Sequence, residues 1–242
     1  MVRFYVAFDD TDTLDCGRGT GKLARWFAEE LPGEFHCWGV VRQQLLNSPR
    51  IPKTSHNSAL CCVIDTPCQG NRDYLIEKGI SHIRRHFVEG SDPGFCVASR
   101  LDPSINALIA FGKMCTSSIM NQEEAIKAAG KSHLSGHGGS NGGIIGAAAA
   151  VGLTAHGESG RLVAYMDIRE LPTLITAGEL RKRRIFPISA QRHAEFIPDH
   201  HSINTQNSIR PHLSGRRLTL PLLQTGLETW ETIHHTEEKS GP

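Results

Sequence analysis

The chain has 242 residues, of which 39% are hydrophobic and 21% are charged. This composition is typical of a globular protein, and the length allows one large domain or two small ones. The formal net charge of +1 excludes a general attraction to nucleic acid or to membrane surfaces, so any site for a polyanion must be local.

The cysteines and the apolar segments indicate the compartment. Seven cysteines occur without any CxxC pair, which favours free thiols in a reducing compartment. The longest apolar stretch, residues 144–153, contains Gly146 and Gly152 and is far shorter than the roughly 20 residues of a membrane-spanning helix. Acids follow the apolar residues 2–8, where a signal peptide would stay apolar. We therefore predict a cytoplasmic protein with no membrane partner.

The first half of the chain alternates predicted strands and helices. Apolar runs predict strands at residues 2–8, 36–41, 59–65 and 95–98. Helical spacing predicts helices at residues 22–31, 71–88 and 106–114, and Pro32 with Gly33 ends the first of them.

The second half has shorter predicted elements. We expect a strand at 115–120, a helix at 122–129, a loop at 132–143, a helix from there to 151, and strands at 161–168 and 218–223. Residues 187–214 are expected to be irregular. The alternation predicts an α/β (α+β) protein with two domains, residues 1–115 and 116–236, followed by a frayed end at 237–242.

The strongest chemical signal follows the first strand. Asp9, Asp10 and Asp12 place three carboxylates within four residues, and these repel one another unless a cation lies among them. Mg²⁺ prefers such hard oxygen ligands and shares them with phosphates. The glycine-rich segment 17–22 and the helix after it can turn backbone N–H groups toward an anion, with Lys22 reaching a phosphate. The pattern is not a Walker A loop. An acidic turn that caps the strand is the alternative interpretation.

Two other segments carry weaker signals. Residues 47–57 present Arg50, Lys53 and His56 between two prolines, as a clamp for phosphates or as a solvated linker. Residues 135–143 form a glycine-rich segment before a helix of small residues, which is either a second anion cradle or a flexible loop leading into a tightly packed helix.

The remaining basic and histidine residues do not predict a site. Residues 179–184 (ELRKRR) are the only dense basic run, and such runs are more often solvated helix faces than RNA contacts. The adjacent pairs His200-His201 and His234-His235 lack a third ligand at a fixed spacing. We therefore expect no zinc site.

Together these segments resemble one protein family. The order is a strand ending in DDTD, a Gly/Thr loop, an arm reading N-x-x-x-I-P-K-T-x-x-N, and a GIIGA helix followed by LVAY. From about residue 3 to about residue 230, the chain resembles agmatinylcytidine synthetase, an archaeal enzyme that modifies the anticodon of an isoleucine tRNA.

The resemblance implies a kinase-like domain followed by a ferredoxin-like domain. It implies ATP and Mg²⁺ as cofactors, phosphorylation of a cytosine carbonyl oxygen, and displacement of that phosphate by agmatine. The family's OB-fold and zinc ribbon, which hold tRNA, begin where the printed sequence ends. We therefore expect weak tRNA binding. The arm also differs from the family, with Ser55-His56 in place of Arg-Gly.

The motifs and the resemblance together give one set of expected site residues. Asp9, Asp10 and Asp12 hold the metal, and Asp9, Asp10, Thr20 and Lys53 act in catalysis. The nucleotide contacts Thr11, Gly17, Arg18, Gly19, Gly21, Lys22, Asn47, Thr54 and Asn57. The alternative functions are a small-molecule kinase or ligase without RNA, and a non-catalytic nucleotide-binding partner subunit of a split synthetase.

Overall fold

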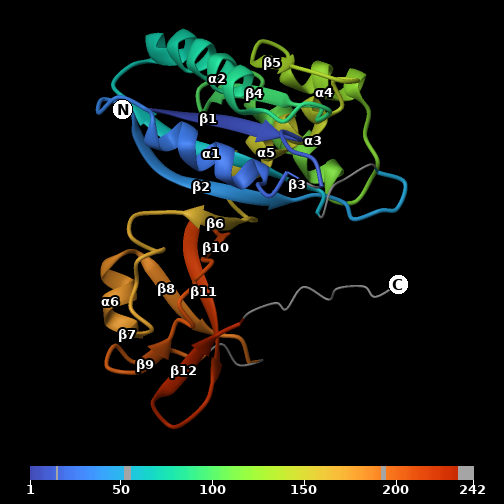
Figure 1. Cartoon of the computed structure of the whole chain (residues 1–242). Coiled ribbons are helices and arrows are strands. Elements are labelled where there is room, and N and C mark those ends of the chain that lie inside the picture. Colours follow the sequence, from blue (N-terminus) through green and yellow to red (C-terminus); the bar gives the residue numbers. More distant parts are fainter. Residues whose placement is uncertain (15, 52–55, 192–194, 234–242) are drawn as a thin grey trace. The chain divides into compact units, whose positions relative to one another are not determined.

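The computed structural model describes residues 1–14, 16–51, 56–191 and 195–233 (Figure 1). The chain forms two compact units, an N-terminal unit, Met1–Tyr165, and a C-terminal unit, Met166–Pro242. Both units combine helices with strands, which confirms the predicted α/β (α+β) class. No helix in the described ranges is long and apolar enough to cross a membrane. All seven cysteines are free of disulfides.

The N-terminal unit contains a six-stranded antiparallel sheet in the order β5-β4-β1-β3-β2-β6. Its strands are β1 (Val2–Asp9), β2 (His36–Gln44), β3 (Ser58–Thr66), β4 (Gly94–Ser99), β5 (His133–Gly136) and β6 (Arg161–Ala164). Helix α1 (Thr20–Glu29) connects β1 to β2, and a 3₁₀ turn (Gln69–Asn71) with helix α2 (Arg72–His86) connects β3 to β4. This strand–helix–strand, strand–helix–strand order is the split βαβ connectivity.

Helices cover both faces of this sheet (Figure 1). The alternation of side chains along β1 puts Phe4, Val6 and Phe8 in a core shared with α1 and α2. The opposite face, which carries Asp9, packs against α5 (Gly143–His156), and α5 packs in turn against α3 (Ile105–Cys115) and α4 (Gln122–Ala129). Asp9 therefore lies between the end of β1 and the first turns of α5.

Small residues allow α5 to approach its neighbours closely. A Cβ on Gly94 of β4 would lie 2.0 Å from the carbonyl carbon of Gly143. A Cβ on Gly152 would lie 1.9 Å from the backbone oxygen of Leu108 in α3. The helix of small residues is therefore tightly packed, which agrees with one of the two interpretations of its sequence.

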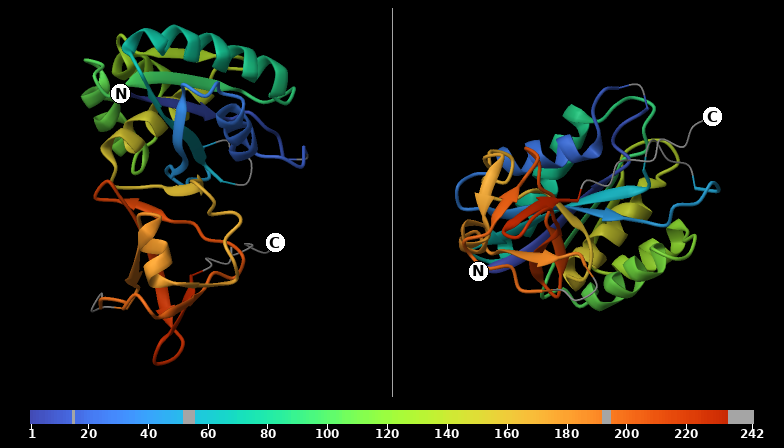
Figure 2. Two further views of the ribbon diagram at one scale, coloured as in Figure 1. Left: turned by 90° about the vertical axis from the view of Figure 1, so that its left-hand side faces the viewer. Right: turned by 90° about the horizontal axis from the view of Figure 1, so that it is seen from below.

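The C-terminal unit has a smaller sheet in the order β10-β11-β12-β9-β7, with β8 pairing parallel to β11. Its strands are β7 (Leu174–Thr176), β8 (Ile185–Ser189), β9 (Ser202–Asn204), β10 (His212–Ser214), β11 (Arg217–Gln224) and β12 (Thr229–Thr232). Helix α6 (Ala177–Lys182) begins at a capping box made by Thr176 and Glu179 and packs beside β7 and β8 (Figure 2).

Several predicted boundaries differ from the structure. The expected strand at 115–120 is wrong, because α3 continues to Cys115 and ends in turns closed by the Lys113 and Met114 carbonyls. The strand expected at 161–168 stops at Ala164, before Met166 takes a positive φ of 42°. Residues 187–214, expected to be irregular, contain β9, β10 and most of β8.

The division into units also differs from the boundary expected near residue 115. Helices α3 to α5 and strands β5 and β6 belong to the N-terminal unit, because they cover or extend the sheet formed by β1 to β4. The split βαβ connectivity, on which a ferredoxin-like fold rests, lies in residues 2–99 rather than in 116–236. The end predicted to fray, 237–242, lies outside the described residues.

Candidate active site

A cavity of about 320 Å³ opens within the N-terminal unit. Its wall is formed by the end of β1, the start of α1, the end of β2 with the connection to β3, Asp92 before β4, residues 115–120 at and after the end of α3, and the start of α5. The sequence analysis singled out three parts of this wall: the acids with the glycine-rich loop that follows them, residues 47–57, and the glycine-rich segment before α5.

The three predicted acids all line this cavity. Strand β1 ends at Asp9, and Asp10 adopts a left-handed backbone with φ of 49°, so the chain turns sharply there. Burial, reinforced by the charges of Asp10 and Asp12, raises the pKa of Asp9 well above its usual range. Burial and the charges of Asp92 and Asp12 raise the pKa of Asp10 to about 6. The cavity therefore concentrates negative charge that a cation would relieve.

The donor set of this acidic end fits Mg²⁺. Carboxylate oxygens are the hard ligands that this ion prefers, and it commonly takes one or two carboxylates while sharing substrate phosphates. The charges of Asp10 and Asp12 raise the pKa of Asp9, and a bound cation would relieve this repulsion. These residues therefore could hold the ion.

A hydroxyl network fixes one of these acids to the start of α1. Asp12 Oδ1 accepts hydrogen bonds from the Thr20 backbone N–H at 2.8 Å and from Thr20 Oγ1 at 2.7 Å. Thr20 Oγ1 also accepts from Thr11 Oγ1 at 3.1 Å. Asp12, which lies eight residues before Thr20 and is not the N-cap residue, thus binds an N–H of the first turn of α1, and Thr20 orients the carboxylate. Both residues also line the cavity, whereas Thr11 is buried behind Thr20.

Replacing Thr20 by valine should remove this orientation while keeping the shape of the side chain. We expect a loss of about 1–3 kcal/mol in the free energy of unfolding, because Asp12 and Thr11 lose a buried partner. Turnover of ATP should fall more than ATP affinity. Thr20→Ser keeps the hydroxyl and is the matched control. Parallel denaturation and ATP-turnover assays test this; wild-type turnover in Thr20→Val would contradict it.

The start of α5 is held by an acid that the sequence analysis missed. Asp92 Oδ2 accepts from the backbone N–H groups of Gly142 at 2.8 Å and Ser140 at 3.1 Å, and from Ser140 Oγ at 2.6 Å. Its Oδ1 is buried and has no hydrogen-bond partner among the described residues. Asp92 lines the cavity with Ser140, Gly142 and Gly143. Nothing in its local sequence predicts this position.

The connection between β2 and β3 supplies positive charge to the cavity wall. Arg50 and His56 line the cavity there, and so does Arg42 near the end of β2, which the sequence analysis did not single out. Asn57 also lines the cavity, and its Nδ2 donates to the Leu46 backbone oxygen at 2.8 Å. Lys53 and Thr54 lie outside the described residues. Asn47 is exposed and is not part of the wall.

The glycine-rich loop contributes only in part. Gly19 and Gly21 line the cavity with Thr20, but Gly17, Arg18 and Lys22 do not. The Arg18 guanidinium donates to the His86 backbone oxygen at 2.7 Å, and the Lys22 ammonium lies 5.1 Å from the Trp26 ring centroid. Arg18 therefore contacts the end of α2, and both Arg18 and Lys22 lie near the Trp26 ring rather than in the cavity wall.

The acids predict a pH-dependent effect of magnesium on stability. The folded pKa of Asp10, about 6, is above its ordinary value of 3.8, so its contribution favours folding at low pH and is lost as pH rises through 6. Bound Mg²⁺ stabilises the ionised carboxylates, so it offsets the free-energy cost of keeping Asp10 charged in the folded protein at high pH. We expect Mg²⁺ to raise the melting temperature more at about pH 8 than at about pH 5. Thermal melts with and without Mg²⁺ measure this, and an equal shift at both values would contradict it.

The chain has relatives among solved structures. No protein-family model matches the chain, and no curated protein matches it at a significant level. The chain is similar to TiaS in the crystal structure of its complex with an isoleucine tRNA and ATP, with 28% identity over 63% of this chain and 36% of that chain and a TM-score of 0.53. It is also similar to TiaS in the complex with an isoleucine tRNA, AMPCPP and agmatine, with 24% identity over 75% of this chain and 44% of that chain and a TM-score of 0.54.

These comparisons establish a TiaS-like fold. The second likeness concerns the fold alone, because its identity is low. The matched region is less than half of either solved TiaS chain.

Proposed function

We propose that the chain is an ATP- and Mg²⁺-dependent enzyme that transfers a phosphoryl group. One observation carries this proposal: a single cavity collects three clustered carboxylates and the first turns of two helices, α1 and α5. The positive ends of the two helix dipoles favour anions, and at these ends Asp12 and Asp92 already accept from the Thr20 and Gly142 N–H groups. Phosphoryl transfer mainly requires positioning and charge neutralisation, and this cavity offers residues for both.

In this proposal each group of residues in the cavity has its own role. Asp9, Asp10 and Asp12 hold Mg²⁺, which neutralises phosphate charge when it is bound. The triphosphate lies against the starts of α1 and α5, with Arg42 and Arg50 supplying positive charge. Thr20 positions Asp12. Lys53 and Thr54 remain proposed phosphate contacts from the arm between β2 and β3.

We further propose the agmatinylcytidine synthetase type of reaction. A carbonyl oxygen of a cytosine-like base attacks the terminal phosphorus of ATP, and the bond to the bridging oxygen breaks to release ADP. An amine such as agmatine then attacks the activated carbon, phosphate leaves with the carbonyl oxygen, and the nitrogen loses a proton. The likeness to a TiaS chain bound to an isoleucine tRNA and ATP supports this class, as does the resemblance of the DDTD and GIIGA segments to the family.

Phosphate release distinguishes this reaction from its two alternatives. The full chain is incubated with ATP, Mg²⁺, agmatine and an isoleucine tRNA transcript, and the control transcript has its anticodon cytosine replaced by uridine. The proposal predicts release of ADP and phosphate that requires the cytosine and the amine. Release without RNA would indicate a small-molecule kinase or ligase. Binding of ATP without release under any condition would indicate a nucleotide-binding subunit.

Binding of tRNA by this chain is expected to be weak. Two of the four cations in residues 179–184 are already engaged: Arg183 pairs with Asp167 at 2.9 Å, and Arg181 pairs with Asp199. Lys182 and Arg184 are exposed, and two cations release counterions from only about two phosphates. We expect a dissociation constant in the micromolar range or weaker at physiological salt, further weakened by charge reversal of Lys182 and Arg184.

An anisotropy titration against salt concentration measures this. The Glu179→Gln variant, which changes charge on the same helix without reversing a cation, serves as the control. Nanomolar binding that survives charge reversal at both positions would contradict the prediction and would place the tRNA surface elsewhere.

A further inference from the structure

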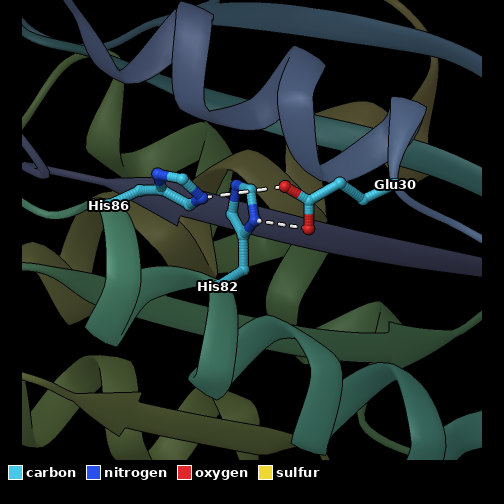
Figure 3. Close-up of side chains that lie close together, drawn as sticks. All are labelled: Glu30, His82 and His86. Carbon is cyan, nitrogen blue, oxygen red and sulfur yellow. Dashed lines mark ion pairs between the residues drawn. The ribbon is translucent and has the colours of Figure 1, made fainter.

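A second cluster of polar side chains lies in the N-terminal unit away from the cavity. Glu30 follows the last turn of α1, and His82 and His86 are one turn apart at the end of α2. Figure 3 shows both imidazole rings directed at the Glu30 carboxylate. His82 Nδ1 lies 3.4 Å from Glu30 Oε2, and His86 Nε2 lies 3.6 Å from Glu30 Oε1. None of the three residues lines the cavity.

The protonation of His82 follows from its other ring nitrogen. His82 is fully buried, and its Nε2 lies 3.0 Å from the Leu23 backbone oxygen. A carbonyl oxygen can only accept, so Nε2 carries the proton. In its neutral form the ring therefore presents an Nδ1 lone pair to a carboxylate oxygen.

A neutral His82 ring and the Glu30 carboxylate present acceptors to each other, and a cation held between them would remove this conflict. The Glu30 side chain is, however, 31% exposed, and its Oε2 also interacts with Lys78. His82 Nδ1 and His86 Nε2 are both buried and have no hydrogen-bond partner among the described residues. Their distances to Glu30 exceed the ordinary range for a hydrogen bond. In a tetrahedral zinc site with bonds of about 2.0–2.1 Å, ligand atoms lie about 3.3–3.4 Å apart. The observed 3.4 and 3.6 Å are close to that spacing.

We propose that Glu30, His82 and His86 bind a divalent transition-metal ion such as Zn²⁺. Two imidazole nitrogens and one carboxylate suit zinc, whereas Mg²⁺ prefers an all-oxygen set. The Leu23 carbonyl fixes the His82 ring as outer partners of metal-bound histidines commonly do. The ion joins the end of α1 to the end of α2, and the fourth position is open to water.

Two neighbouring cationic side chains repel a metal ion at this site, so removing one of their charges tests the proposal. Lys78 Nζ lies 3.1 Å from Glu30 Oε2, and Arg85 lies 3.6 Å from the same oxygen. Arg18 contacts the His86 backbone. Removing the Lys78 charge should therefore strengthen metal binding, whereas a hydrogen-bonded His–Glu cluster without metal would gain nothing of the kind.

The test is a Zn²⁺ titration of the chelator-treated full chain by calorimetry, in excess Mg²⁺ so that the carboxylates of the cavity are already engaged. We expect one tight site, which Glu30→Gln and His86→Gln each weaken at least about tenfold, since even outer partners of metal ligands cost that much. Lys78→Gln should bind at least about fivefold more tightly. His200→Gln is the matched control, because His200, His201 and Glu228 form a largely exposed cluster of similar composition.

The absorption spectrum of Co²⁺ bound to the same variants gives a second readout, which reports nitrogen ligation and is independent of calorimetry. Absence of a tight site would overturn the proposal. So would binding that Glu30→Gln and His86→Gln leave intact, binding lost in His200→Gln, or affinity unchanged in Lys78→Gln.

Discussion

Replacing Asp10 by asparagine is expected to change metal-free stability and nucleotide affinity in opposite directions. The substitution removes a hard ligand for Mg²⁺, so Mg²⁺-dependent affinity for ATP should fall at least about tenfold, or roughly 1.4 kcal/mol. It also removes a carboxylate whose pKa is raised to about 6 by burial and by Asp92 and Asp12. In the absence of divalent ions, the melting temperature at neutral pH should therefore rise.

The matched control for this experiment is Asp73→Asn, which removes one negative charge from an exposed position at the start of α2. Calorimetry with ATP and thermal melts without metal provide the two readouts. Unchanged ATP affinity in Asp10→Asn would contradict the assignment of the acidic end of the cavity. A lower metal-free melting temperature would contradict the electrostatic account of it.

Replacing Gly146 by alanine is expected to reduce turnover far more than stability. A Cβ at this position in α5 would lie 1.8 Å from Asp9 Oδ2. The Cβ would also lie 2.5 Å from Asp9 Cγ, so the whole carboxylate must move, and a displacement of about 1 Å can cost about 100-fold in rate. Alanine also favours a helix over glycine by about 1 kcal/mol, which limits the loss of stability.

Gly152→Ala in the same helix should show the reverse. There the added Cβ would meet the Leu108 backbone oxygen at 1.9 Å, and a backbone cannot turn aside as a side chain can. We expect destabilisation of about 1–3 kcal/mol, with near-normal turnover by the folded molecules because Gly152 does not line the cavity. Steady-state kinetics and denaturation of both variants test the pair. Equal losses of turnover would show that Gly146 has no special relation to Asp9.

The N-terminal sheet was predictable because its signals are local. Strand β1 is a continuous apolar run, buried from Phe4 to Phe8, and such a run predicts a buried strand that ends at the acids. Strands β9 and β10 were not predictable, because three residues are too few to show a period of two. The domain boundary was missed because membership of α3 to α5 depends on which sheet they cover, a tertiary property.

The candidate site was predictable only where one segment carries the signal. The sequence singled out Asp9, Asp10 and Asp12 as adjacent acids. Asp92 and Arg42 reach the cavity from other segments, so no spacing in the sequence relates them to it. The expected absence of a zinc site considered neighbouring histidines, whereas Glu30 joins His82 and His86 only through the packing of α1 beside α2. The i, i+4 spacing of the two histidines was the one available signal.

Calorimetric titration of ATP into the full chain, with and without Mg²⁺, tests the central claim most directly. The cavity formed by the acids and the starts of α1 and α5 predicts one binding site per chain, with tight binding in the presence of Mg²⁺ and a large loss of affinity after chelation. Absence of ATP binding in the presence of Mg²⁺, or binding of equal strength without the ion, would contradict the account.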